Sequence, residues 1–127
     1  MHSLKIKIYY EDTDAGGVVY YANYLRYFER ARTEFLLENG VNVAAYHEKG
    51  YIFAVVHVDI QYKRPARLGD TIEVATEVKE LKNATISLKQ RALKNDVLLV
   101  EAEVKLACVN KDGKPQRLPP GVKSLSN

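Results

Sequence analysis

One long stretch of this sequence has the hydrophobic spacing of a helix, and almost everything after it alternates with a period of two. Between Asn23 and Asn39, large apolar side chains recur every three or four residues, with charged side chains between them. From Gly50 to Asn110 the chain consists of alternating apolar and polar residues interrupted by turns. These periods are typical of an amphipathic helix and of half-buried strands. The sequence therefore predicts an α+β fold with one long helix and one sheet.

Five segments have the strand pattern. They are residues 4–8, 52–62, 71–78, 86–92 and 98–108. The almost unbroken apolar run at 52–58 predicts a strand covered on both faces. The last four strands follow one another through turns, which favours an antiparallel meander. Because the helix needs an apolar surface for its buried stripe, we expect a curved, antiparallel five-stranded sheet wrapped around one long central helix.

The ends of the long helix also have recognisable signals. Asn23 is the expected N-cap, because its side chain can accept a hydrogen bond from a free amide of the first turn. Asn39-Gly40 is the expected stop, since glycine adopts the left-handed conformation that ends many helices. A shorter helical turn is expected over residues 43–49.

Length and charge limit the possible functions. The 127 residues predict a single domain over 1–127, and a small sheet with open edges predicts a homodimer or homotetramer. Lys and Arg number 19 against 16 Asp and Glu and are spread along the chain, so we expect no nucleic acid partner. No apolar run approaches the ~18 residues of a membrane span.

Cysteine and histidine usage argues against disulfide and metal chemistry. The one cysteine, Cys108, falls in an apolar strand pattern, which predicts a buried thiol in a reducing, cytoplasmic protein. The three histidines form no pair with metal-binding spacing, so no metal site is expected.

The turn before the helix is the best candidate for chemistry. Asp14 lies there beside Gly16 and Gly17, and the amides of residues 19–22 lead into the helix. Free N–H groups at a helix N-terminus favour a negative oxygen. Two interpretations stay open: Asp14 only accepts hydrogen bonds within a tight turn, or it attacks, or activates water at, a carbonyl that these amides polarise. Asp12 is interpreted as a residue that stabilises the turn.

The same turn carries a family resemblance. The string YEDTDAGGVVY at 10–20, followed by ANY at 22–24 and ERAR at 29–32, resembles the opening signature of hotdog-fold acyl-CoA thioesterases. The subgroup is that of 4-hydroxybenzoyl-CoA thioesterase and the Tol-Pal-associated enzymes. Tyr62, PARLGD at 65–70 and RLP at 117–119 extend the resemblance over nearly the whole chain. It implies a hotdog fold with active sites at subunit interfaces.

The resemblance also implies roles for individual residues. Asp14 takes the position of the catalytic carboxylate, and the backbone N–H of Tyr21 takes that of the donor that polarises the thioester carbonyl. Many members of the Tol-Pal-associated branch have histidine where this chain has Tyr21. A backbone donor survives that exchange, whereas any role of an imidazole does not. Whether Asp14 is a nucleophile or a general base stays open.

Seven residues are candidates for contact with the substrate. They are Gly17, Val19, Tyr20, His57, Lys63, Arg64 and Arg67. The three basic residues would bind the nucleotide phosphates of coenzyme A, with solvated surface charge as the alternative interpretation. His57, in an apolar strand, is either a hydrogen-bonded structural residue or faces the ligand. No cofactor is expected, since coenzyme A is part of the substrate.

The expected function is the hydrolysis of acyl-CoA to a free carboxylic acid and coenzyme A. The alternatives are a non-hydrolytic acyl-thioester binding protein and an enzyme that acts on thioesters of acyl carrier protein, which is then a further partner. A dehydratase of the same fold would be expected to have a histidine in the active-site turn or helix start. No histidine lies between His2 and His47.

Overall fold

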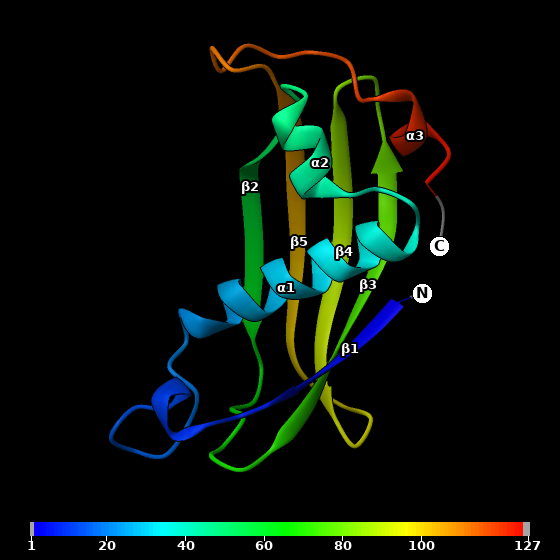
Figure 1. Cartoon of the computed structure of the whole chain (residues 1–127). Coiled ribbons are helices and arrows are strands. Elements are labelled where there is room, and N and C mark those ends of the chain that lie inside the picture. Colours follow the sequence, from blue (N-terminus) through cyan, green and yellow to red (C-terminus); the bar gives the residue numbers. More distant parts are fainter. Residues whose placement is uncertain (1, 126–127) are drawn as a thin grey trace.

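The computed structural model describes residues 2–125 and has one antiparallel sheet in the strand order β1-β3-β4-β5-β2. The strands are β1 (His2–Lys7), β2 (Ile52–Tyr62), β3 (Thr71–Leu81), β4 (Thr85–Lys94) and β5 (Val97–Val109). The helices are η1 (Tyr10–Asp12), α1 (Asn23–Glu38), α2 (Val43–Glu48) and α3 (Pro120–Lys123). Figure 1 shows α1 lying across one face of the curved sheet. The predicted α+β class and five-stranded antiparallel sheet are confirmed.

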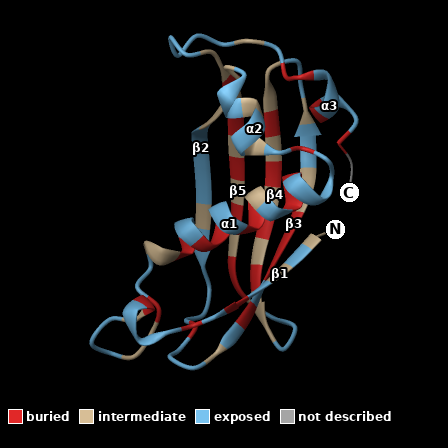
Figure 2. Cartoon of the chain, viewed as in Figure 1, coloured by how far each residue is buried: buried red, intermediate tan, exposed pale blue. Residues whose placement is uncertain are grey.

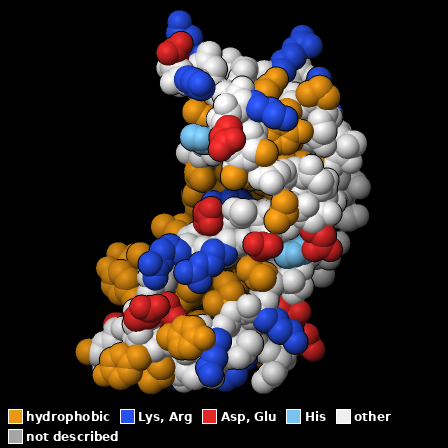
Figure 3. All heavy atoms as spheres, viewed as in Figure 1, with side chains coloured by type: hydrophobic (Ala, Val, Ile, Leu, Met, Phe, Trp, Pro, Cys, Tyr) orange, Lys and Arg blue, Asp and Glu red, His pale blue; other side chains and the backbone are white. Residues whose placement is uncertain are grey.

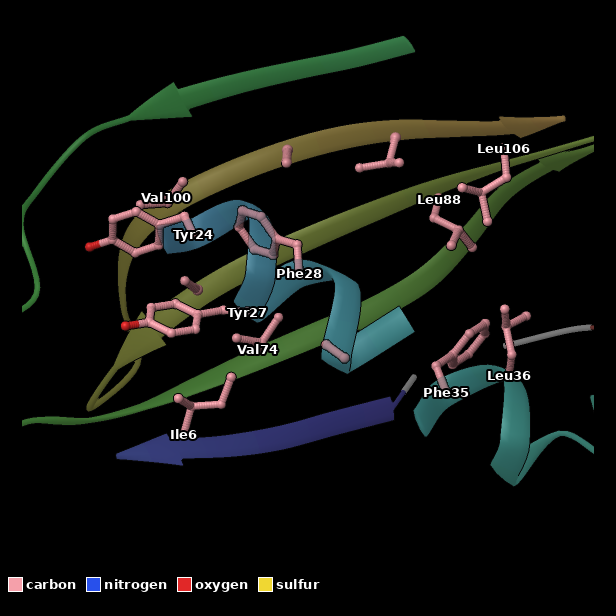
Figure 4. Close-up of a cluster of buried hydrophobic side chains, with 14 of the residues drawn as sticks. Ile6, Tyr24, Tyr27, Phe28, Phe35, Leu36, Val74, Leu88, Val100 and Leu106 are labelled. Carbon is pink, nitrogen blue, oxygen red and sulfur yellow. The ribbon is translucent and has the colours of Figure 1, made fainter. Parts of the chain in front are cut away.

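The core lies between α1 and the inner face of the sheet. Phe28, Ala31 and Phe35 project from one side of α1 and are at most 1% exposed. They face the buried alternate residues of β3, β4 and β5, the red bands in Figure 2. Figure 4 shows the aromatic and aliphatic side chains packed together, with the Tyr24 and Tyr27 hydroxyl groups pointing out of the cluster. Burying the apolar stripe of α1 therefore fixes the helix on the sheet.

The two ends of α1 differ in how well they could be predicted. The stop is confirmed: Gly40 has φ +82°, the Val41 N–H donates to the Leu36 carbonyl (2.7 Å) and the Gly40 N–H to Leu37 (3.0 Å). This is a Schellman motif. The expected N-cap is wrong, because Asn23 is already helical and uses its side-chain amide elsewhere.

The meander covers only three of the four strands expected in it. β3, β4 and β5 are consecutive neighbours, but β2 pairs with the far side of β5 and β1 pairs with β3. Short turns close the two hairpins, with Asn95 and Asp96 in the left-handed conformation between β4 and β5. The longer segment 63–70, which includes Pro65, instead carries the chain from β2 to the opposite side of the sheet. The length of this connection is what separates β2 from β3.

β2 is also less covered than the sequence predicts. Val55, Val56 and Val58 are 48%, 56% and 37% exposed. The strand forms one edge of the sheet, so among residues 2–125 nothing pairs with its outer side. An apolar strand on an open edge is a surface that proteins normally cover. No helix in the described part of the chain is long and apolar enough to cross a bilayer.

Candidate active site

Asp14 begins a tight turn that its own main chain closes. Its N–H donates to the Val18 carbonyl (2.9 Å), and its carbonyl accepts from the Gly17 N–H (3.1 Å). Gly17 has φ +76°, a conformation that favours glycine. One carboxylate oxygen, Oδ1, accepts the Gly16 N–H at 2.8 Å. The side chain is exposed, and no donor of the described residues reaches the other oxygen, which is therefore open to water or substrate.

Asp12 holds this turn against the start of α1. The residue is 6% exposed, and its Oδ2 accepts the Tyr9 N–H at 2.8 Å. Its main-chain carbonyl accepts from the Tyr20 N–H (3.0 Å) and from Nδ2 of Asn23 (2.8 Å). The prediction that Asp12 stabilises the turn is confirmed. Sequence reasoning missed the role of Asn23, the first residue of α1. Its side chain ties the start of the helix to the turn that carries Asp12 and Asp14.

Only two of the four amides before α1 are free. The Val19 N–H donates to the Ala66 carbonyl (2.9 Å), and the Tyr20 N–H is used by Asp12. The N–H groups of Tyr21 and Ala22 have no acceptor within residues 2–125. They precede the first residue of α1, where the helix dipole adds partial positive charge. Two adjacent free donors at a helix start can bind a carbonyl oxygen or an oxyanion.

A group of tyrosines surrounds these amides. The Tyr62 hydroxyl donates to the Tyr21 carbonyl at 3.2 Å, and its ring lies 6.1 Å from that of Tyr21 and 5.7 Å from that of Tyr24. The Tyr24 hydroxyl accepts the Ala66 N–H at 3.1 Å. Burial, and next the nearby Tyr21, raise the pKa of Tyr62, which keeps its hydroxyl protonated as a donor. The high tyrosine content of the sequence, nine of 127 residues, was a signal that could have indicated such a group.

A cavity of about 260 Å³ opens beside Tyr21. It is lined by Val19, Tyr21, Tyr24, Tyr62, Lys63, Arg64 and Pro65. The structure thus brings Lys63 and Arg64 into one cavity with Tyr21, and the main-chain N–H groups of both basic residues donate to the Leu99 carbonyl. Arg67 pairs through its main chain with Val18 at the base of the turn, and its side chain is exposed.

The surface around the cavity is aromatic and apolar. Tyr20 is 48% exposed, and its ring lies 4.9 Å from that of Tyr21. Figure 3 shows hydrophobic side chains gathered at the lower left, over the loop before α1. The exposed members near this loop are Tyr9, Tyr10, Tyr20, Tyr21, Leu25, Tyr62 and Leu68. A planar base or an acyl chain can pack against such a surface.

His57 is not part of this cavity. It pairs with Lys105 and lines a separate hollow of about 140 Å³ with Lys79 and Glu103, on the face of the sheet away from α1. A β-bulge between Val55 and His57 explains this position, because one extra residue reverses the alternation of side chains along β2. Simple alternation from Val55 would have turned His57 towards α1.

Three comparisons with known proteins agree with this architecture. The family model described as thioesterase-like superfamily matches residues 9–125. The acyl-CoA thioesterase YbgC of Haemophilus influenzae is 46% identical over 124 residues, which cover 96% of this chain and 91% of that protein. A probable thioesterase from Bartonella henselae has a similar crystal structure, with a TM-score of 0.87 and 38% identity over 93% of this chain and 98% of the other.

A second crystal structure matches the whole fold. A hypothetical protein from Aquifex aeolicus superposes with a TM-score of 0.94 and 28% identity, covering all of both chains. The turn that carries Asp14 and the two free amides falls inside the segment that the family model matches. This chain belongs to the thioesterase-like superfamily of hotdog proteins.

Proposed function

We propose that this protein is an acyl-CoA thioesterase in which Asp14 supplies the reactive carboxylate and the amides of Tyr21 and Ala22 bind the thioester carbonyl oxygen. The observation that carries the proposal is the pair of free N–H groups at the start of α1, held next to the acidic turn by Asp12. A relative at 46% identity is named an acyl-CoA thioesterase. A protein that only binds thioesters needs no open carboxylate beside such donors.

Two routes use the same groups. In the first, a carboxylate oxygen of Asp14 attacks the thioester carbon, coenzyme A leaves as a thiolate, and water hydrolyses the resulting anhydride. In the second, Asp14 takes a proton from water, the hydroxide attacks, and the tetrahedral intermediate expels the thiolate. In both, negative charge develops on the oxygen that faces the two amides. Neither route needs a cofactor, and a pre-steady-state burst of thiol release with substrate in excess indicates the first.

The basic residues at the cavity are proposed to bind the phosphates of coenzyme A. The side chains of Lys63, Arg64 and Arg67 are exposed and form no ion pair with the described acidic residues. Lys63→Ala and Arg64→Ala together should raise KM for acyl-CoA about tenfold. KM for a short thioester without the nucleotide should not change, and an equal rise for both substrates would contradict this role.

The principal test is Asp14→Asn. Asparagine keeps an oxygen that can accept the Gly16 N–H, so the turn and the fold are expected to survive. The substitution removes the base or nucleophile, and kcat for acyl-CoA should fall at least ~100-fold. Asp112→Asn, in another exposed turn, is the matched control and should keep full activity. Retention of most of the turnover by Asp14→Asn would sink the assignment.

We further propose that two copies associate through their β2 edges as a homodimer, which can pair again to a homotetramer. β2 offers an open edge with three exposed valines, whereas the other edge, β1, is short and carries Lys5 and Lys7. Val58→Lys should therefore yield monomers in light-scattering measurements. Ser3→Lys, which adds the same charge to the β1 edge, should not. The reverse pattern would place the interface on β1.

We propose coenzyme A as the preferred carrier of the acyl group and the cytoplasm as the compartment. Acyl carrier protein presents its acyl group on the same phosphopantetheine arm, so a substrate panel should include both carriers at matched chain length. The buried free thiol of Cys108 is consistent with a reducing cytoplasm, where we place the protein. Dependence on acyl carrier protein, with no hydrolysis of any acyl-CoA, would overturn the preference for coenzyme A.

A further inference from the structure

A second cavity, outside the candidate active site, lies between α1, α2 and the β2 edge. Its volume is about 130 Å³. Its lining is mostly apolar, from Leu36, Val43, Phe53, Val55 and Leu106, with Glu29, Arg32 and Thr33 as its polar members. Figure 3 shows the molecule hollowed in this region, between α2 and α1. The cavity has room for a small organic group.

Arg32 is the unusual member of this lining. Its side chain projects from α1 towards the sheet and is only 9% exposed. Its guanidinium makes one hydrogen bond, from Nη1 to Oε1 of Gln90 at 3.2 Å, and no carboxylate of the described residues lies within ion-pair distance. Burial lowers its pKa, and Glu29 only partly opposes this shift. A buried cation without a counter-ion is costly, so most proteins pair it.

The geometry around Gln90 fixes the direction of the guanidinium. Gln90 is fully buried, and its Nε2 donates to the Phe28 carbonyl (2.9 Å) and to Oγ1 of Thr76 (3.0 Å). Both of its donor hydrogens are therefore used, and its oxygen can only face Arg32. The side-chain amide of Gln90 thus fixes Nη1 of Arg32 on the side that faces the core.

The remaining N–H groups of Arg32 face the cavity. The enclosed polar atoms without a partner in residues 2–125 are Nδ1 of His2 and the Tyr27 hydroxyl, and no guanidinium nitrogen is among them. The unpaired nitrogens of Arg32 therefore reach open space, and the space that this residue lines is the apolar cavity. A planar guanidinium with free N–H groups fits a carboxylate with two parallel hydrogen bonds.

We propose that this cavity is a binding site for a carboxylate on a short apolar stem, with Arg32 binding the two oxygens and the lining of α1, α2 and β2 enclosing the stem. The ligand can come from two sources. One is the distal carboxylate of a long dicarboxylic acyl group on coenzyme A, since Arg32 lies about 15 Å along α1 from the amides of Tyr21 and Ala22; this assignment rests on the proposed thioesterase function. The other is a free carboxylic acid, the chemical class of the reaction product, and this source does not depend on it.

Binding of butyrate tests the site directly. Butyrate, titrated into protein with labelled methyl groups, should shift the signals of Leu36, Val43, Val55 and Leu106, and n-butanol at the same concentration should not. Asp14→Asn should bind butyrate as the wild type does, so a failure of the proposed function leaves this result intact. Arg32→Met should weaken binding at least tenfold. The proposal is overturned if butyrate shifts none of these signals, or if butanol binds equally well.

The two sources are separated by kinetics. If the acyl group supplies the carboxylate, Arg32→Met should lower kcat/KM for dodecanedioyl-CoA at least tenfold more than for dodecanoyl-CoA. If a free acid is the ligand, the substitution should instead weaken butyrate binding at least tenfold and change kcat/KM for both substrates alike. Arg32→Lys keeps the charge without the planar fork and should give intermediate effects in either arm. Wild-type kinetics with unchanged butyrate binding in both variants would refute the site.

Discussion

Gln90→Leu is the substitution whose effect can best be calculated from the structure. The Gln90 side chain connects α1 to two strands, because it bonds the Phe28 carbonyl, the Thr76 hydroxyl and the Arg32 guanidinium. Leucine has a similar volume and removes all three hydrogen bonds without leaving a large void. The loss therefore measures the polar network, reduced by the gain from burying a more apolar side chain.

The expected cost follows from the three groups left behind. Loss of the hydrogen bonds to the Phe28 carbonyl and the Thr76 hydroxyl costs about 1 kcal/mol each. The cost is no larger because the carbonyl remains part of α1 and the hydroxyl can rotate. Arg32 keeps its buried charge without any partner, which adds about 2 kcal/mol, and the better burial of leucine returns about 1 kcal/mol. The free energy of unfolding should fall by about 3 kcal/mol. With an unfolding entropy of ~2.1 cal/mol/K per residue, Tm should fall by roughly 11 °C.

Urea unfolding followed by circular dichroism measures this loss, at two protein concentrations so that association does not enter the comparison. The double variant Arg32→Met, Gln90→Leu is the diagnostic partner. Because it removes the unpaired cation, it should be more stable than Gln90→Leu alone. A loss below 1 kcal/mol for Gln90→Leu, or a double variant whose loss is the sum of the two single losses, would refute the reasoning.

Three further predictions concern the loop and its support. Tyr21→Ala keeps the backbone donor and should retain kcat within about fivefold, whereas Tyr21→Pro removes it and should lower kcat about 100-fold in steady-state assays, with circular dichroism confirming the fold. Tyr62→Phe should lower kcat several-fold, because the Tyr21 carbonyl loses its 3.2 Å bond, while the free energy of unfolding changes by no more than about 1 kcal/mol. Partial burial opposes ionisation of Asp70, but its hydrogen bonds to Lys94 and to the Arg67 N–H lower its pKa overall. The stabilisation is therefore complete above the unfolded pKa of ~3.9 and lost as pH falls through the lower folded value. The difference in stability between wild type and Asp70→Asn should begin to shrink below about pH 4 and disappear only below the folded pKa of Asp70.

The long helix and all five strands could be predicted from local pattern, because each buries one face and so has a regular period. Pattern could not predict the pairing of β2, since an apolar run is the same whether a strand is covered by its own chain or by a second copy. The position of His57 was unpredictable for another reason, because one bulge reverses a face without any sequence signal in the alternation. Asp14 was identified from its place before the helix together with the family resemblance. The tyrosine group and the Arg32 cavity were missed because their members come together only in space.

The geometry of the loop explains why the side chain at position 21 is not needed to hold the Tyr21 N–H in place. The loop is shaped mostly by main-chain atoms together with two side chains. The Asp12 carboxylate accepts the Tyr9 N–H, and the Asn23 amide donates to the Asp12 main-chain carbonyl. None of these bonds uses the side chain of Tyr21, and its N–H is free because Tyr20 and Val19 occupy the neighbouring acceptors. Backbone geometry thus fixes the Tyr21 N–H, the donor in the proposed reaction, and its position does not depend on the side chain of residue 21. By this reasoning Asn23→Leu, which removes the bond to the Asp12 carbonyl, should lower kcat more than Tyr21→Ala does, although it changes no group that touches the thioester.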